Sequence, residues 1–240
     1  MGPLLSRAGV DRPCDTLQAV LFDMDGLLVD TEPLWFEVES SVMARLGGDW
    51  TAADQHVLVG GSLRRTVSHL IDRASGPEGG ASQDEVADWL VGGMTELLGS
   101  RDVVPLPGAI ELLAEVRAAG LPYALVTSSE RVIVDAVLRA LERYGVTFEV
   151  IVAGADVDNP KPHPEPYQRA AALVGADPRC CAALEDSPNG VASAEAAGCL
   201  TVAVPGLARV AEEPGRLIVG SLTDVNLDLL RTLLAGNGTA

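Results

Sequence analysis

Short apolar runs alternate with longer amphipathic segments along most of the 240-residue chain. The first run, from Leu17 to Phe22, has the length and composition of a buried strand. Runs of the same kind follow at 122–126, 148–152, 180–184, 200–204 and 217–219. Segments with helical periodicity follow the later runs or precede them, at 109–119, 130–143, 166–174, 189–197 and 223–234. Apolar strands that alternate with helices predict a parallel sheet that is covered on both faces.

Residues 32–103 interrupt this alternation directly after the first strand. Their pattern predicts helices and no strand, at about 33–46, 51–59, 63–74 and 82–98. Ser82 and Glu85 have the spacing of a capping box, and Thr31 is available to cap the first of these helices.

We therefore expect an α/β protein with a Rossmann-like parallel-sheet core and an inserted α-helical cap domain. The core is discontinuous and consists of residues 17–31 and 104–240. Residues 32–103 form the cap, and residues 1–16 form a loose N-terminal tail.

Polar side chains stand directly after three of the predicted strands, and one more stands in the loop after another strand. They are Asp23 and Asp25, then Thr127 with Ser128, then Glu185 and Asp186, and Lys161 in its loop. The carboxyl ends of the strands in an open α/β sheet meet at one edge, where ligands bind. Two carboxylates spaced two residues apart on a strand share a face and favour a hard cation such as Mg²⁺ between them. This set of groups suits phosphoryl transfer.

The formal net charge of −17 argues against nucleic acid or an anionic membrane surface as a partner, because both need basic patches. It does not exclude a small anionic substrate, since a local cation can outweigh the distant field. Among the 17 basic residues, Lys161 is the only lysine. A lone lysine in an arginine-rich chain points to a role that needs a compact point charge.

The four cysteines include no CxxC pair, and we interpret them as reduced thiols in a cytoplasmic protein. Residues 1–16 lack the apolar core of a signal peptide, and no apolar run has the length of a transmembrane span. We expect a monomer or a weak homodimer that acts on a small phosphorylated metabolite, without nucleic acid or membrane partners.

Four short motifs occur in a specific order and spacing. They are Asp23-Met24-Asp25-Gly26, then Thr127, then Asn159-Pro160-Lys161-Pro162, then Glu185-Asp186-Ser187. In these motifs, over roughly 17–205, the chain resembles the haloacid dehalogenase-like superfamily of phosphotransferases. The resemblance is to the branch that contains β-phosphoglucomutase and related sugar-phosphate phosphatases.

The resemblance implies a role for each matching residue. Asp23 attacks phosphorus and becomes phosphorylated, while Asp25 serves as general acid and then as general base. Thr127 and Lys161 bind the phosphoryl oxygens, and Ser128 is a further candidate for this binding. The implied Mg²⁺ ligands are Asp23, the backbone carbonyl of Asp25, Asp186, and Glu185 directly or through water. The cap closes over the site, excludes water and selects the leaving group.

Asp25 favours a phosphate ester over a haloacid as the substrate, because a halide leaves without protonation. The absence of lysine from residues 32–103 argues against a phosphonate-cleaving relative, which needs a cap lysine for its Schiff base. Trp35 stands where the mutase of this branch carries histidine. We therefore predict a Mg²⁺-dependent phosphatase that acts on a small phosphomonoester, and the substrate class that the sequence favours is a sugar phosphate. A β-phosphoglucomutase-type mutase and an inactive binding protein on the same fold remain as alternatives, and Trp35, Arg64 and Arg65 are the cap candidates for substrate contact.

Overall fold

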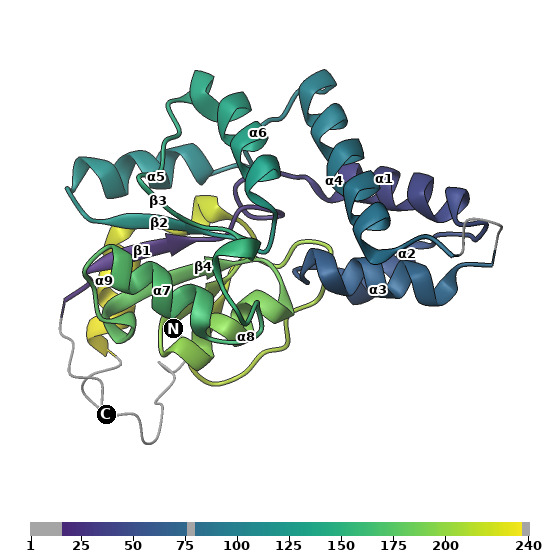
Figure 1. Ribbon diagram of the computed structural model, residues 1–240. Helices are drawn as coiled ribbons and strands as arrows, with labels where there is room; N and C mark the ends of the chain where they lie inside the picture. Colours follow the sequence, from purple (N-terminus) through teal and green to yellow (C-terminus); the bar gives the residue numbers. More distant parts are fainter. Residues whose placement is uncertain (1–15, 76–79, 237–240) are drawn as a thin grey trace.

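The computed structural model describes residues 16–75 and 80–236, so the predicted tail at 1–16 lies outside the described residues except for its last position. The prediction of an α/β fold is confirmed: six parallel strands form one sheet in the order β3-β2-β1-β4-β5-β6 (Figure 1). The strands are β1 Ala19–Phe22, β2 Tyr123–Val126, β3 Val150–Val152, β4 Cys181–Glu185, β5 Leu200–Ala203 and β6 Arg216–Ile218. β1 lies at the centre of this order and pairs with both β2 and β4.

Successive residues of β1 pack on opposite faces of the sheet, as the period of a strand requires. Val20 and Phe22 belong to the larger apolar core, whereas Ala19 and Leu21 belong to a second core on the other face. The larger core includes residues of α5 Ala109–Ala118, α6 Arg131–Leu141 and α9 Leu227–Gly236; the second includes residues of α7 Glu165–Leu173 and α8 Pro188–Ala197. Figure 1 shows α5 and α6 on one side of the sheet and α7 and α8 on the other.

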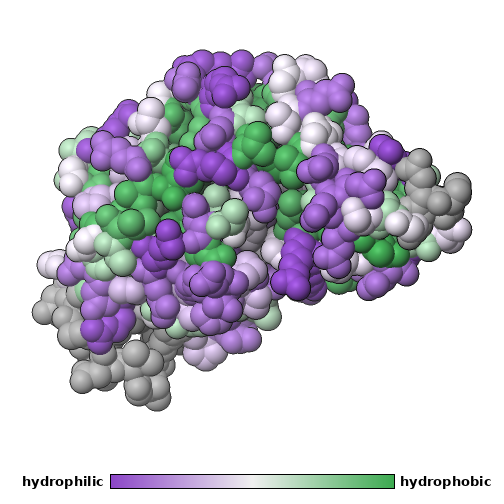
Figure 2. All heavy atoms as spheres, viewed as in Figure 1, coloured by the Kyte–Doolittle hydropathy of each residue, from purple (hydrophilic) through white to green (hydrophobic). Residues whose placement is uncertain are grey.

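Between β1 and α5 the described residues form four helices, as the pattern of 32–103 predicts. They are α1 Glu32–Arg45, α2 Ala52–Leu58, α3 Leu63–Arg73 and α4 Gln83–Ser100. We call these four helices and their loops the helical unit; in Figure 1 it lies beside the carboxyl end of the sheet. Figure 2 shows a notch in the surface where the helical unit meets the α/β part.

Two details at the ends of helices differ from the predictions. Thr31 makes no side-chain capping bond to α1: its backbone is in the α region rather than the extended conformation of a capping residue, and its hydroxyl donates to Asp25. The last helix does not begin at residue 223: a 3₁₀ turn spans Leu222–Asp224, and Asn226 then accepts a hydrogen bond from the amide of Leu229 at the start of α9. The capping box of Ser82 and Glu85 is confirmed.

The cysteines are not all reduced. Cys181 and Cys199 are buried thiols outside any disulfide, whereas Cys180 is disulfide-bonded, so the prediction of reduced thiols is wrong for Cys180. No helix in the described ranges combines the length and the apolarity that crossing a bilayer requires.

Candidate active site

The carboxyl end of β1 carries the two aspartates. Asp23 is buried and follows Phe22, the last residue of the strand, and Gly26 then turns the chain with a φ of +77°. A Cβ at Gly26 would collide with the carboxylate of Asp186, so glycine is required here both for the turn and for the close approach. The turn thus holds the loop after β1 directly against the loop after β4.

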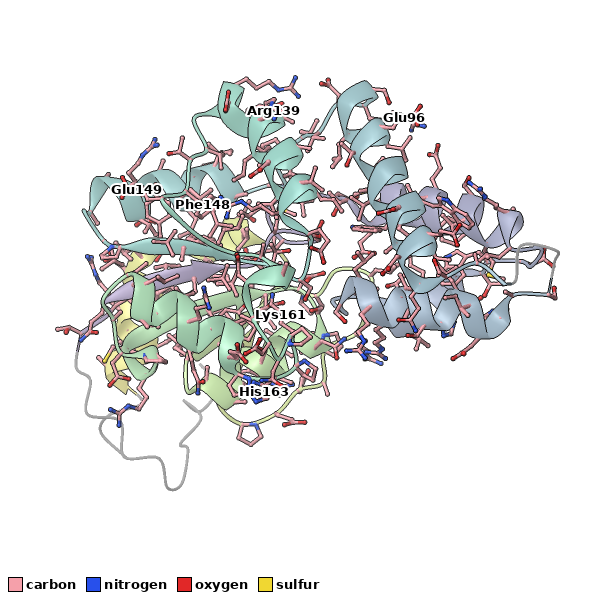
Figure 3. The ribbon with its side chains drawn as sticks, viewed as in Figure 1. Glu96, Arg139, Phe148, Glu149, Lys161 and His163 are labelled. Atoms are coloured by element: carbon pink, nitrogen blue, oxygen red, sulfur yellow. The ribbon has the colours of Figure 1, made fainter. Side chains whose placement is uncertain are left out.

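Lys161 connects three of the strand ends. Its Nζ donates to Oδ1 of Asp23 and to Oε1 of Glu185, each at 2.6 Å, and to the carbonyl oxygen of Val126 at 2.9 Å. The lysine is 5% exposed, and Figure 3 shows it at the carboxyl end of the sheet, inside the loop that precedes α7. Its charge is therefore committed to the buried acidic groups rather than to solvent.

The carboxylate of Asp25 is held by three hydroxyl groups. Thr31 Oγ1 donates to Oδ1 at 2.6 Å, while Ser129 Oγ and Thr127 Oγ1 donate to Oδ2 at 2.7 and 3.2 Å. These donors come from the residue that precedes α1 and from the loop after β2, so two segments that are far apart in sequence orient the same side chain. Asp25 thus lies beside Asp23 without sharing its lysine.

Asp23, Glu185 and Asp186 form a buried acidic cluster whose potential ligand oxygens all lie within 4.8 Å of one another. Burial, the first cause, and the neighbouring carboxylate Glu185 raise the pKa of Asp23, and Lys161 only partly opposes this. Burial and the charge of Asp23 likewise raise the pKa of Asp186. Oδ2 of Asp186 is buried without a hydrogen-bond partner among the described residues. Oxygen ligands in this arrangement fit a divalent cation of the Mg²⁺ type, which would satisfy the orphaned oxygen.

A cavity opens between this cluster and the helical unit. Asp23, Asp25, Thr127, Ser128 and Lys161 line its α/β side. On its other side the lining includes Trp35, whereas Arg64 and Arg65 are exposed and do not line it. The structure thus brings one of the three cap candidates to the cavity and leaves the two arginines outside.

The loop between α2 and α3 contacts the α/β part beside the cavity. Ser128 Oγ donates to the carbonyl of Gly60 at 3.4 Å, and Asn189 Nδ2 donates to the carbonyl of Val59 at 3.1 Å. Gly60 has a φ of +67°, and a Cβ there would collide with Ser187. The close approach of Gly60 to Ser187 therefore places the helical unit over the site.

Sequence reasoning missed several residues of the site, among them four that hold or border the acidic groups. Thr31 and Ser129 hold Asp25, and Tyr167 of α7 donates its hydroxyl to Oε1 of Glu185 at 2.6 Å. Glu39 is buried on α1 and lines the cavity. Two of these residues could have been found from the sequence, because they stand close to recognised motif residues. Tyr167 is six residues after Lys161, and Ser129 is two residues after Thr127.

Comparisons with known proteins identify the relatives of this chain. The family model described as "Haloacid dehalogenase-like hydrolase" matches residues 20–204. The chain is 36% identical to protein CbbY of Rhodobacter capsulatus, over 79% of this chain and 86% of the relative. It is 34% identical to hexitol phosphatase B of Escherichia coli K12, over 90% of this chain and 94% of the relative. A crystal structure of a CbbY mutant from Rhodobacter sphaeroides in complex with xylulose-(1,5)bisphosphate aligns with a TM-score of 0.78 at 26% identity, over 90% of this chain and 99% of that one.

Proposed function

The chain belongs to the haloacid dehalogenase-like hydrolase family and is a phosphatase of that type, and we propose that it hydrolyses a small sugar phosphate with Mg²⁺ through an aspartyl-phosphate intermediate. One observation carries the proposal: Lys161 Nζ lies 2.6 Å from Asp23 Oδ1 while Asp25, beside it, is held by separate hydroxyls. A nucleophile next to a fixed cation and a separately oriented acid is what phosphoryl transfer needs.

In the first step the carboxylate of Asp23 attacks phosphorus. The bond from phosphorus to the ester oxygen breaks, and Asp25 gives its proton to that oxygen, so the sugar leaves as a neutral alcohol. Lys161 neutralises charge on the phosphoryl oxygens during this transfer, and the hydroxyls of Thr127 and Ser128 line the place where these oxygens bind. The product on the protein is a phosphorylated Asp23.

In the second step Asp25, now a carboxylate, takes a proton from a water molecule that attacks the same phosphorus. The bond between phosphorus and the Asp23 oxygen breaks, inorganic phosphate leaves, and both aspartates return to their starting states. Thr31 and Ser129, whose hydroxyls donate to Asp25, keep this side chain in one place through both transfers.

Asp23, Glu185 and Asp186 would hold Mg²⁺, together with the backbone carbonyl of Asp25. The bound ion would supply positive charge that balances the phosphoryl oxygens and keeps the Asp23 carboxylate ionised. The close packing of Gly26 on Asp186 and the hydrogen bond from Tyr167 to Glu185 orient these carboxylates toward one another.

We take residues 32–103 as the cap and residues 17–31 with 104–240 as the core. The contacts of Gly60 and Val59 with the α/β part support a cap that excludes bulk water from the phosphorylated Asp23. A cytoplasmic location and a monomeric or weakly dimeric state stay predictions.

The deciding experiment measures phosphate release with Mg²⁺ from a panel of sugar and nucleoside monophosphates, with the wild type beside Asp23→Asn. We expect release by the wild type and none by the variant. The panel includes β-glucose 1-phosphate, with formation of glucose 6-phosphate followed in the same tubes. Isomerisation without release would support the mutase alternative, and the absence of both products would support a binding protein.

A further inference from the structure

The wall of the cavity that faces Asp23 and Asp25 is built from the helical unit. Its polar side chains are those of Glu32, Glu39, Gln55 and Thr66, and Trp35 adds an indole ring. They come from α1, α2 and α3, and Glu39, Gln55 and Thr66 are buried. A phosphate bound at Asp23 would direct the rest of its molecule toward this wall, which therefore contacts the leaving group.

The wall offers hydrogen-bonding groups without a positive charge. Among the described residues that line the cavity, Lys161 alone carries a cationic side chain, and it faces Asp23 and Glu185 on the opposite side. The nearby Arg64 and Arg65 are exposed, and Arg65 donates to the backbone carbonyl of Val57. A second phosphate at this wall would be desolvated without a counter-charge, which is unfavourable by several kcal/mol.

Two side chains of the wall, Glu39 and Thr66, can each form a further hydrogen bond with a hydroxyl group of the substrate. Glu39 accepts one hydrogen bond at Oε2, from the indole nitrogen of Trp50 at 3.1 Å, and Oε1 has no further partner among the described residues. The hydroxyl of Thr66 makes no side-chain hydrogen bond among the described residues, although the residue is buried. Burial raises the pKa of Glu39 to about 8. The described side chains of the wall include no cation that could compensate a second anion.

We infer that the leaving group is a neutral, polyhydroxylated carbon chain or ring, and that Glu39 and Thr66 select it by bonding its hydroxyls. The inference rests on the proposed phosphatase activity and narrows its substrate to sugar or polyol monophosphates, against sugar bisphosphates. Trp35 also lines the cavity and adds apolar surface for the carbon skeleton of the leaving group.

The test compares three kinds of substrate: hexose and hexitol monophosphates, the corresponding hexose bisphosphates, and nitrophenyl phosphate. Nitrophenyl phosphate has no hydroxyls for the wall to bond, so it reports the chemistry at Asp23 alone. We expect kcat/KM to be higher for monophosphates than for bisphosphates. Glu39→Leu and the isosteric Thr66→Val should each lower kcat/KM for the monophosphates by about tenfold to hundredfold and leave nitrophenyl phosphate unchanged.

The matched control is Glu37→Gln, because Glu37 is on the same helix but is half exposed and paired with Arg101. It should leave all three substrate classes unchanged. Because there are two wall variants, Glu39→Leu and Thr66→Val, one can still be measured if the other fails to fold. Activity on nitrophenyl phosphate shows whether each variant is folded.

The outcomes separate this inference from the proposed function. A preference for bisphosphates, above all one that Arg64→Ala or Arg65→Ala removes, would overturn the inference while the phosphatase stands. Equal losses on nitrophenyl phosphate and on sugar phosphates in both wall variants would also overturn it. Failure of the wild type to release phosphate from any substrate, nitrophenyl phosphate included, would instead overturn the proposed function and the inference with it.

Discussion

The ammonium group of Lys161 lies 2.6 Å from Oδ1 of Asp23, although 138 positions separate the two residues in sequence. The same nitrogen lies equally close to Glu185, and all three side chains are buried. The ammonium group donates hydrogen bonds in three directions, to the two carboxylates and to the Val126 carbonyl. A planar guanidinium cannot direct its donors to these three acceptors in the same way.

Lys161→Arg should therefore lower kcat by about 100-fold or more, although the charge is kept, because the longer planar group displaces the carboxylates it must bridge. Phosphate release under saturating substrate measures this. The control is the reverse exchange at an exposed position, Arg139→Lys, which should leave kcat unchanged. Near-normal turnover by Lys161→Arg would remove this lysine from direct contact with the phosphoryl group.

Thr31→Val removes the 2.6 Å hydrogen bond to Asp25 while it keeps the shape of the side chain. We expect about a tenfold lower kcat/KM on sugar phosphates, since the acid is less well oriented. Nitrophenyl phosphate should be affected much less, because its leaving group needs little protonation. Thr95→Val, which removes only a bond to the Val91 carbonyl within α4, is the control. Equal losses on both substrates would mean that Thr31 does not act through Asp25.

Gly60→Ala tests the contact between the helical unit and the α/β part. Alanine in this left-handed conformation costs about 1–2 kcal/mol, and its Cβ would meet Ser187. The loop should move off the site, so kcat/KM should fall by about tenfold to hundredfold. Gly92→Ala in α4 is the control, because a Cβ there meets nothing within 4 Å and alanine favours the helix. Unchanged kinetics in Gly60→Ala would show that this contact is not needed for turnover.

The succession of strands and helices along the chain could be predicted because short apolar runs alternate with longer helical segments, and glycine, proline and capping residues mark many of the boundaries. The meeting of Asp23, Thr127 and Glu185 could be predicted as well, since the carboxyl ends of parallel strands share one edge. These predictions depend on local patterns and on a general rule of sheet topology, so they need no knowledge of how individual loops fold.

The remaining part of the site depends on contacts between one element and the next, which leave no pattern within the sequence of a single element. Glu39 stands next to Val38 on α1 and resembles a surface position, yet it is buried and bonded to Trp50, which follows the helix. Thr31 has the sequence signature of a helix cap, but the turn after β1 brings Asp25 close enough to accept a hydrogen bond from the Thr31 hydroxyl. In both cases a partner placed by the tertiary fold overrides the local preference.

Chelation tests the acidic cluster in two independent ways. EDTA should abolish phosphate release and added Mg²⁺ should restore it. Mg²⁺ should also raise the melting temperature of the wild type in the absence of substrate, because at a hundredfold excess over Kd its binding adds about 2.7 kcal/mol to the free energy of unfolding. Asp186→Asn should lose most of this shift, because it removes a charged oxygen ligand that is buried without another partner. Full activity in EDTA would remove the metal from the mechanism, and an unchanged thermal shift in Asp186→Asn would remove Asp186 from the ligand set.

The pH dependence of stability provides the last test, and it concerns Glu39. Burial, with a smaller effect of Glu32, raises the pKa of Glu39 from 4.5 to about 8, while the indole of Trp50 only partly opposes this. Between pH 4.5 and pH 8 the Glu39 carboxyl keeps its proton in the folded state but loses it in the unfolded chain. The stability that Glu39 contributes is therefore fully present below pH 4.5 and is lost as the pH rises to 8.

Glu39→Gln removes this titration and keeps the hydrogen-bonding shape. Its free energy of unfolding, relative to the wild type, should increase from pH 5 to pH 8 by at most about 1.4 kcal/mol per pH unit. Urea denaturation at fixed Mg²⁺ across this range measures the difference, and the exposed Glu37→Gln should give a flat line. A flat line for Glu39→Gln as well would mean that water reaches this carboxyl group freely, and the wall of the cavity would then be an ordinary solvated surface.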